Sequence, residues 1–489
     1  MLGNEAAVDP ESHEESEDMM ITSLREFVSY KTISSNHEFA EDCRQGATWL
    51  RSLFKKLGAE VEMLHADDVL HHPVVFAKFT GKQRTGHKRK RVLFYGHYDV
   101  VPADTKDAKW DSDPFQLRGE NGFLYGRGVS DNKGPIMAAL YAVTDLMQAK
   151  SLDSDVLFLI EGQEESGSSG FRRTVRTHRD TIGDVDYVLL ANSYWLNDDI
   201  PCLTYGLRGV MHATICVESQ RPDLHSGVDG SYMINEPMSD LMTILSKLKG
   251  PRNTIMLPGF YDNIPELTPE EEARYDAIID ALGVRTNGET VAGNLKKNLM
   301  ARWREPNLTQ HAVNVSGSGG GLISSHASAK ISIRLVPGQE VQETVDALTS
   351  YLQNEFSNLV SDNVLTVQID NTAEPWLGDP DNYIFRTLEE AVVKAWSPLF
   401  AAKSDANGTE SSTEDKANEA GSKGPSKPLY IREGGSIPAI RFLEKEFDAP
   451  AAHLPCGQAS DSAHLNNEKL RVENLFKSRE IFADVFRRL

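Results

Sequence analysis

A histidine and an aspartate two residues apart follow a short apolar segment early in the chain. His97 and Asp99 lie directly after the apolar run Val92–Tyr95. Residues two apart on an extended chain point to the same side, and a carboxylate beside a metal-ligating imidazole fixes its tautomer and raises its basicity. The pair therefore fits a metal ligand with its orienting carboxylate, although a strand-end histidine followed by a turn aspartate would have the same sequence.

Carboxylates occupy two further turns. Asp131 lies in the glycine-rich segment 126–135, just before a predicted helix whose first turn holds a proline. A proline suits that position, and Asp131 could either cap the helix or bridge two cations. Glu164 and Glu165 follow the apolar run 156–160. Such a pair fits a solvated acidic loop, or a dinuclear cation site in which one carboxylate ligates and the other takes a proton from bound water.

The fourth candidate is a histidine, His464, in a loop of small residues near the C-terminus. Taken alone it would be interpreted as a surface residue. Imidazole and carboxylate groups together, however, are the ligand set expected for zinc or a similar borderline cation. Three of the four clusters fall at the ends of predicted strands on one edge of one sheet. Their conjunction predicts a dinuclear metal site.

The elements that must position these residues alternate between strands and helices. The apolar runs 92–95, 156–160 and 187–190 are typical of buried parallel strands, and helical patterns such as 135–148 separate them. This is the rhythm of a doubly wound α/β sheet. In such sheets the ligand site lies beyond the carboxyl ends of the strands, where the four clusters are expected.

A second domain is predicted to be inserted into the first. After residue 209 the pattern changes to that of a small α+β sandwich, and the charged stretch 266–300 is expected to add helices to it. The segment 404–428 has almost no apolar content, so it cannot bury enough surface to offset its ordering entropy. The predicted parts are a disordered acidic tail (1–19), a catalytic domain of mixed-sheet α/β type in two pieces (20–209 and 373–489), the inserted sandwich (210–372) and a disordered insertion (404–428).

The bulk composition excludes several classes of protein. The chain has 51 Lys plus Arg against 72 Asp plus Glu, a net charge of −21, whereas a nucleic-acid-binding body needs a basic face. The four cysteines have no paired spacing, which argues against a disulfide framework or a structural cysteine–zinc site and fits a reducing cytosol. No apolar run reaches 18 residues and no signal peptide is visible. We expect a cytoplasmic protein that binds neither nucleic acid nor membrane.

The segments around these residues resemble the zinc dipeptidase family, which includes carnosinases, aminoacylases and glutamate-releasing carboxypeptidases. The resemblance covers nearly the whole chain after residue 20. It rests on the segments YGHYDVVP, GRGVSDNKGP, EGQEESGS, YGLRG, DLHSG, SIRLVPGQ, REGGSIP and SDSAHLNNEKL. The stretch HLPCGQASDSAHLNNEKL is most similar to the peptidase-like subunit of the fungal glutathione-degradation complex. The resemblance implies that the inserted domain acts as a lid and dimerisation domain.

The resemblance also implies a metal-binding role for each matching residue. Asp131 would bridge two metals. His97 would complete one site, with Asp99 orienting it, and Glu165 and His464 would hold the other metal. The expected cofactor is Zn²⁺, two per subunit, with Mn²⁺ as an alternative.

The remaining roles concern the reaction and the substrate. Glu164 would be the general base for attack by a metal-bound hydroxide, and His225 would enter the active site of a partner subunit and stabilise the oxyanion. Arg334 would clamp the substrate carboxylate, a task that suits its planar fork. The segment REGGSIP would line the substrate pocket through Arg432, Gly435 and Ser436.

Two positions depart from the family pattern. Asn192 stands where the dipeptidases have an aspartate that ligates the His97 metal. An amide oxygen can ligate but carries no charge, so this site is expected to bind its metal weakly. Gly321 stands where dipeptidases often have a threonine near the substrate.

The favoured hypothesis is a homodimeric dinuclear metallopeptidase that hydrolyses a dipeptide, a tripeptide or a γ-glutamyl peptide such as glutathione. The alternative is a catalytically weak subunit that activates a glutamine-amidotransferase-like partner in glutathione degradation, which Asn192 favours. A third reading, an N-acyl amino acid deacylase, fits the same metals but matches the dipeptidase segments less well.

Overall fold

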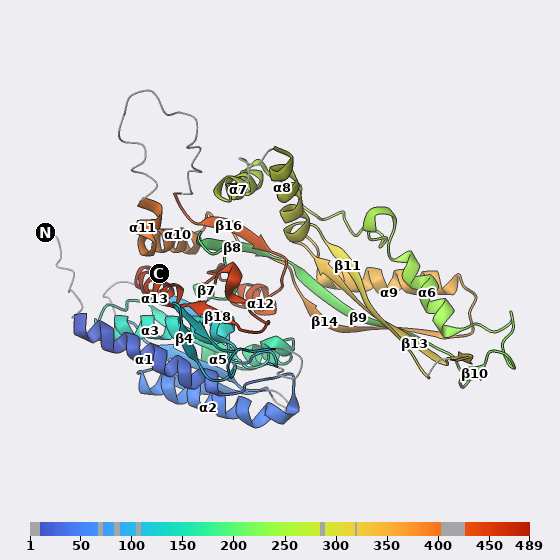
Figure 1. Ribbon diagram of the computed structural model, residues 1–489, viewed down its shortest axis with the longest axis horizontal. Helices are drawn as coiled ribbons and strands as arrows, with labels where there is room; N and C mark the ends of the chain where they lie inside the picture. The colour runs from blue at the N-terminus through green and yellow to red at the C-terminus, as the bar shows by residue number, and fades with distance from the viewer. Residues whose placement is uncertain are drawn as a thin grey trace.

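The computed structural model describes residues 10–66, 72–82, 89–103, 109–283, 289–317, 320–401 and 426–489. Among these residues, a mixed sheet of nine strands lies at the centre of the larger part of the molecule (Figure 1). Its strands are β1 (Glu60–Leu64), β2 (Val74–Phe79), β3 (Arg91–His97), β6 (Asp155–Glu161), β7 (Tyr187–Leu190), β8 (Cys202–Leu207), β15 (Trp376–Leu377), β16 (Leu429–Glu433) and β17 (Ala451–His453). The order is β1-β2-β6-β3-β7-β17-β8-β15, with β16 paired to β8. β3 is parallel to both β6 and β7. The three predicted buried strands are therefore neighbours.

Helices cover both faces of this sheet. Phe94 of β3 packs its ring against Phe482, whereas the next residue, Tyr95, packs against Phe171. Successive residues of a strand point to opposite faces, so the helices that carry these partners, α13 and α4, lie on opposite sides. The helices of this part are α1 (Pro10–Ser29), α2 (Ala40–Lys56), α3 (Gly134–Gln148), α4 (Phe171–Thr177), α5 (Arg179–Ile182), α10 (Tyr383–Ala395), α11 (Ser397–Ala401), α12 (Pro438–Phe447) and α13 (Val472–Arg488). The predicted α/β fold class is confirmed.

Short elements complete this part of the chain. Three strands form a small separate sheet in the order β18-β5-β4. Its strands are β4 (Arg118–Glu120), β5 (Phe123–Tyr125) and β18 (Lys469–Arg471). The short helical turns among the described residues are η1 (His37–Phe39), η2 (Val129–Lys133), η3 (Glu164–Ser166), η4 (Pro251–Asn253) and η7 (Ala459–Asp461).

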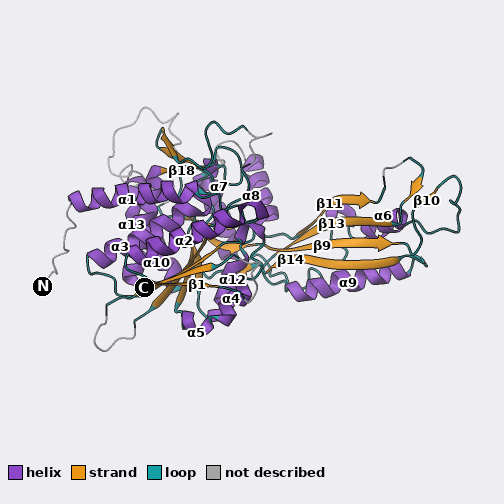
Figure 2. Ribbon diagram, turned by 90° about the horizontal axis from the view of Figure 1, so that it is seen from below, coloured by secondary structure: helices purple, strands orange, loops and turns teal. Residues whose placement is uncertain are grey.

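A second, four-stranded antiparallel sheet extends away from the larger part (Figure 2). Its order is β11-β13-β9-β14, where the strands are β9 (Gly209–Glu218), β11 (Asn307–Val315), β13 (His326–Leu335) and β14 (Val364–Ala373). Helices α6 (Pro237–Lys247) and α9 (Val341–Ser357) pack their apolar residues into one core with the inner face of this sheet. A two-stranded antiparallel sheet of β10 (Leu224–His225) and β12 (Leu322–Ile323) forms its far tip. The unit has the predicted α+β composition, and its boundaries at 210 and 372 stay predictions.

The helices of the charged stretch 266–300 pack in a different place from the predicted one. α7 (Pro269–Ala281) and α8 (Glu289–Trp303) contribute Tyr275, Ile279 and Trp303 to the core of the larger part, not to that of the four-stranded unit. The prediction that they belong to the inserted sandwich is therefore wrong. The apolar spacing of a helix indicates that one face is buried, but not which sheet buries it.

The N-terminal prediction is corrected as well. Helix α1 begins at Pro10, so residues 10–19 of the predicted disordered tail are helical, while residues 1–9 lie outside the described part. The helix is anchored further along, where Met20, Leu24 and Phe27 are buried. Extending an anchored helix costs far less than nucleating one, so a polar segment joined to it can continue the helix. Most of the predicted insertion 404–428 lies outside the described residues. Among the described helices none is long and apolar enough to cross a bilayer.

Candidate metal centre

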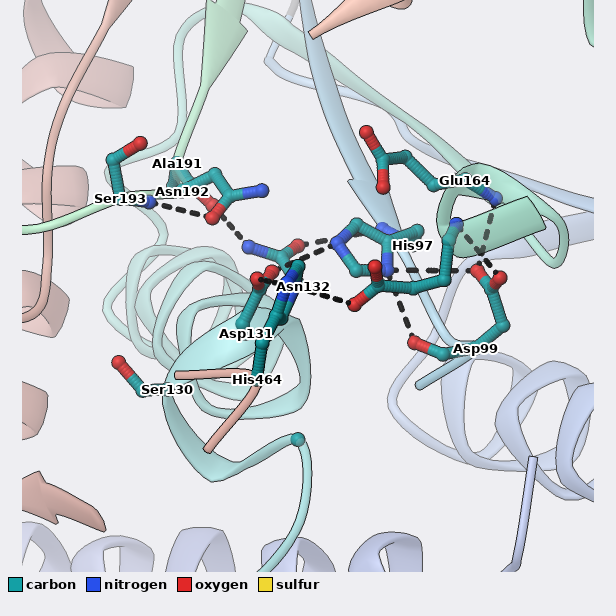
Figure 3. Close-up of polar contacts among 12 residues, drawn as sticks. His97, Asp99, Ser130, Asp131, Asn132, Glu164, Ala191, Asn192, Ser193 and His464 are labelled. Atoms are coloured by element: carbon teal, nitrogen blue, oxygen red, sulfur yellow. Dashed lines mark hydrogen bonds and ion pairs between the residues drawn. The ribbon is translucent and has the colours of Figure 1, made fainter. Parts of the chain in front are cut away.

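Five predicted ligands and catalytic residues lie together at the carboxyl ends of β3 and β6. His97 is the last residue of β3, Glu164 and Glu165 open η3 after β6, and Asp131 lies in η2 before α3. His464 arrives from the loop between η7 and β18. Figure 3 shows the side chains of His97, Asp131 and His464 converging on one point. The edge of the sheet is the one at which the sequence places the site.

The two oxygens of the Asp131 carboxylate face different histidines. Oδ1 lies 3.0 Å from Nε2 of His97, and Oδ2 lies 3.0 Å from Nε2 of His464. Nε2 of His464 is also 3.0 Å from Oε1 of Glu165. One imidazole nitrogen carries at most one proton, which the two carboxylates would have to share, whereas a cation can contact both fully. The donor set, imidazoles around a central carboxylate, therefore fits two neighbouring divalent cations with Asp131 between them.

Two overlapping groups of side chains have the spacing needed to hold a cation each. Asp131, Glu165 and His464 place one ligand atom each within 4.8 Å of one another. His97, Glu164 and Glu165 do the same. Both groups were found among the described residues, and both contain the predicted ligands.

The Asp99 carboxylate positions the turn that carries the glutamates. Its Oδ1 accepts a hydrogen bond from the backbone N–H of Glu164 (3.1 Å), and its Oδ2 accepts from that of Glu165 (3.0 Å) and from the hydroxyl of Ser34 (2.6 Å). The backbone carbonyl of Asp99 lies closer to Nδ1 of His97 (3.0 Å) than its carboxylate does (3.5 Å). The carbonyl therefore holds the proton on Nδ1 and leaves Nε2 free to ligate.

Burial and mutual proximity shift the protonation of the cluster. Burial raises the pKa of Glu164 well above its ordinary value; the positive charge of His97 opposes this, while the Glu165 and Asp131 carboxylates add to it. Hydrogen bonds to Asp131 and Glu165 raise the pKa of His464 to about 10. Burial would raise the pKa of Asp131, but its hydrogen bonds to both histidines lower it. Asp131 is thus held ionised, while Glu164 is the group best able to take up a proton.

A buried glutamate that sequence reasoning missed fixes the turn around Asp131. The Glu468 carboxylate pairs with the guanidinium of Arg127 at 2.8 Å, and both side chains are at most 2% exposed. It also accepts hydrogen bonds from the backbone N–H groups of Gly128 (2.9 Å), Ser130 (3.0 Å) and Asp131 (3.1 Å). Glu468 follows His464 by four residues, so it ties the loop of one ligand to the turn of another. Its place in the segment SDSAHLNNEKL was the only signal in the sequence.

Asn132 joins the same turn to the ends of two strands. Its amide nitrogen donates to the carbonyl of Ala191, and its amide oxygen accepts from the backbone N–H of His97 at 3.3 Å. A Cβ at Gly96 would lie 2.6 Å from that amide oxygen. Glycine before His97 is therefore required by the close approach of Asn132, a second positioning residue that the sequence did not reveal.

Asn192 follows β7 beside the cluster (Figure 3). Its amide oxygen accepts a hydrogen bond from the backbone N–H of Ser193 at 2.5 Å, and its carbonyl accepts one from Nε2 of His453 at 2.8 Å. The amide oxygen is the atom that could ligate a cation, and it is held by its own neighbour. The amide NH₂ group has no lone pair to offer a cation.

The predicted substrate residues are partly brought together. Arg334, near the end of β13, donates to the hydroxyl of Ser436 at 3.0 Å, and the carbonyl of the adjacent Gly435 accepts from the backbone N–H of Arg208. Arg432 is placed elsewhere: its guanidinium pairs with Glu271 of α7 at 2.8 Å, and both side chains are below 10% exposed.

His225 does not reach the cluster of its own chain. It lies in β10, at the far tip of the four-stranded unit (Figures 1 and 2). Its side chain is exposed, and its Nδ1 accepts the backbone N–H of Gly227 at 3.1 Å. Gly321 lies beside it, since the carbonyl of Gly321 accepts the backbone N–H of Ser226 at 2.7 Å. The two residues that the resemblance links to the substrate therefore share this tip.

A carboxylate–imidazole centre at the carboxyl edge of an α/β sheet is typical of metal-dependent hydrolases. Comparisons with known proteins agree. Residues 93–488 match the model of peptidase family M20/M25/M40. The chain therefore belongs to this peptidase family.

Individual relatives are similar over most of the chain. The probable di- and tripeptidase DUG2 of Saccharomyces cerevisiae is 40% identical over 96% of this chain, but the chain spans only about half (50%) of that relative's length. The Cys-Gly metallodipeptidase dug1 of Schizosaccharomyces pombe is 32% identical, with 95% of this chain and 94% of the relative covered. The solved structure of the di-peptidase Dug1p from Saccharomyces cerevisiae superposes with a TM-score of 0.76 at 27% identity, covering 97% of this chain and 96% of that one.

Proposed function

We propose that this chain is a cation-dependent peptidase that hydrolyses small peptides: a dipeptide, a tripeptide or a γ-glutamyl peptide such as glutathione. The observation that carries the proposal is the orientation of Asp131, whose two oxygens each face one histidine at 3.0 Å. Asp131, His97, Glu165 and His464 would hold two divalent cations, Zn²⁺ or Mn²⁺. When bound, such cations polarise a carbonyl and make a water molecule more acidic.

Glu164 is the proposed general base. Its backbone is fixed by Asp99, and burial together with the neighbouring carboxylates raises the pKa of its side chain. A base whose pKa is raised towards neutrality takes a proton from the attacking water and can deliver it to the leaving amine. Arg334, supported by Ser436, would bind the terminal carboxylate of the peptide.

Two adjacent glutamates provide the test. Glu164→Gln should lower the rate of dipeptide hydrolysis by about 10²–10⁴-fold, the usual effect of removing a general base, and leave the cation content unchanged. Glu165→Gln is the matched variant, and it should lose cation instead, because Glu165 contacts His464. Near-wild-type hydrolysis by Glu164→Gln would rule out the proposed mechanism.

A homodimer completes the proposed site. His225 lies at the tip of the four-stranded unit, and the loop that follows it exposes Val228, Tyr232 and Met233 by 80%, 98% and 75%. Such apolar side chains on one loop are typical of a surface that another protein covers. We infer that this loop enters the neighbouring subunit, where His225 would stabilise the oxyanion.

A second candidate function is supported by Asn192. The amide oxygen that could ligate the His97 cation is held by the Ser193 N–H, and the position carries no negative charge. On this proposal the chain is a weak peptidase that activates a glutamine-amidotransferase-like partner in the cytosol. Glutathione hydrolysis that appears only when such a partner is added would support it. Full activity of the isolated chain, with two tightly bound cations, would exclude it.

A further inference from the structure

Three residues with metal-ligating side chains meet on the four-stranded unit, far from the centre around Asp131. Cys216 and Glu218 lie two residues apart near the end of β9, and His326 is the first residue of β13. In the antiparallel register His326 stands opposite Glu218, and Ser328 stands opposite Cys216. Residues two apart on a strand share a face. All three side chains therefore project from the outer face of the sheet, opposite α6 and α9.

The distances within this group match the edges of a tetrahedral zinc site. Sγ of Cys216 lies 3.3 Å from Nδ1 of His326, and Oε1 of Glu218 lies 3.1 Å from the same nitrogen. Bond lengths of about 2.3 Å for sulfur and about 2.0–2.1 Å for nitrogen and oxygen give tetrahedral edges of about 3.6 Å and 3.3 Å. Small side-chain movements are enough to bring the three atoms to one cation. One ligand atom from each residue lies within 4.8 Å of the other two.

The backbone that carries the ligands is rigidly placed. β9 and β13 are the two inner strands of the sheet, so each is hydrogen-bonded on both sides. The carbonyl of His326 accepts the backbone N–H of Ser316 (3.1 Å) and the hydroxyl of Ser324 (2.6 Å). A site on fixed strands loses little conformational entropy when a ligand binds.

The chemistry of the group also fits a cation. A ligating cation deprotonates a coordinating thiol, so the Cys216 side chain can serve as a thiolate ligand. The side chains of His326 and Glu218 are 40% and 60% exposed, so water can occupy a fourth position. A set of one sulfur, one nitrogen and one oxygen suits zinc and similar borderline cations.

We propose that Cys216, Glu218 and His326 form a binding site for one zinc-like divalent cation on the outer face of the four-stranded sheet. The site is separate from the centre at Asp131 and does not depend on peptidase activity. No sequence pattern indicates this site, because Cys216 and His326 are 110 residues apart and neither belongs to a paired motif.

The site adjoins the base of the β10–β12 sheet that carries His225. The backbone N–H of Ser325, next to His326, donates to the carboxylate of Asp223 at 2.7 Å, and the Ser316 hydroxyl donates to the same oxygen at 3.2 Å. Asp223 immediately precedes β10. A cation on His326 would therefore hold the base of the β10–β12 sheet, and its binding would order the tip.

Cobalt(II) gives a test that reports this site alone. The full chain is stripped with a chelator and titrated with Co²⁺, and the near-ultraviolet charge-transfer band of a cobalt–thiolate bond is followed. The centre at Asp131 contains no cysteine, and the other three cysteines are buried and outside the ligand groups found among the described residues. Elemental analysis after Zn²⁺ loading and dialysis gives the stoichiometry independently.

The proposal requires a thiolate band in the wild type that saturates at one equivalent and is absent from Cys216→Ser. His326→Gln should weaken Co²⁺ binding at this band by about tenfold or more, since even an outer-shell change has that effect. Ser328→Ala, on the same face and opposite Cys216, is the matched control and should keep the band. Cys216→Ser should also bind one Zn²⁺ fewer than the wild type. A wild type without the band, a band that survives Cys216→Ser, or unchanged affinity in His326→Gln would overturn the proposal.

Discussion

Replacing Glu468 with glutamine should damage both stability and cation binding, although Glu468 touches no cation itself. Each oxygen of its carboxylate accepts two hydrogen bonds: Oε2 from Arg127 and Gly128, and Oε1 from Ser130 and Asp131. In glutamine one of these oxygens becomes an NH₂ group that faces two donors. The charge that balances Arg127 is lost as well.

The size of the effect can be worked from these contacts. Hydrogen bonds to a charged group contribute about 1.5–3 kcal/mol each, so the loss of two amounts to about 3–6 kcal/mol. Removing one partner of a buried ion pair costs about 3–5 kcal/mol, and both Arg127 and Glu468 are at most 2% exposed. Burial raises the pKa of Glu468, an effect that Arg127 and the Gly128 N–H oppose. We therefore expect Glu468→Gln to lower the free energy of unfolding by about 3–5 kcal/mol.

Urea unfolding followed by circular dichroism measures the loss of stability, and a competitive chelator titration measures the affinity for cation. The affinity should fall by about tenfold or more, because Glu468 fixes the turn that carries Asp131. Glu473→Gln is the matched control, since Glu473 is exposed at the start of α13 and its removal costs no more than about 1 kcal/mol. A Glu468→Gln variant as stable as this control, with unchanged cation affinity, would refute the positioning role.

Three further predictions concern Asn192, His225 and His453. Asn192→Asp adds the missing negative charge, so elemental analysis after dialysis should show occupancy rising towards two cations per subunit; unchanged occupancy would contradict the argument from charge. His225→Ala should lower peptide hydrolysis without changing cation content, and light scattering of the wild type should show a dimer. An active monomer would refute the proposal that His225 enters the active site of the neighbouring subunit. Burial lowers the pKa of His453 from 6.5 to about 4, so the unfolded chain binds the proton more readily and stability is lost as the pH falls from about 6.5 to 4. The difference in pKa corresponds to about 3 kcal/mol of unfolding free energy. Between pH 6.5 and 4, His453→Gln should therefore lose about 3 kcal/mol less stability than the wild type. An identical pH dependence of the two proteins would contradict this prediction.

The sequence was informative wherever a motif and a strand end coincide. His97 and Glu165 could be predicted as neighbours because β3 and β6 are parallel and adjacent, and such strands end at one edge of a sheet. The role of Glu468 could not be predicted, since its partner Arg127 is 341 residues away. A single glutamate in a loop is also what an ordinary solvent-exposed side chain looks like. The assignment of α7 and α8 failed for a similar reason: periodicity indicates a buried face but not its partner.

The residues that build the metal centre come from distant parts of the sequence, which has a consequence for how the protein folds. Asp131 and Glu468 are 337 residues apart, and closing so long a loop is entropically costly and slow. The turn around Asp131 is therefore completed only when β18 and α13 dock. A cation held by both Asp131 and His464, as proposed, would bind the finished fold and not the partly folded chain, so it would shift the folding equilibrium by mass action. The supply of cation would then set the yield of native protein during synthesis, before any substrate is met.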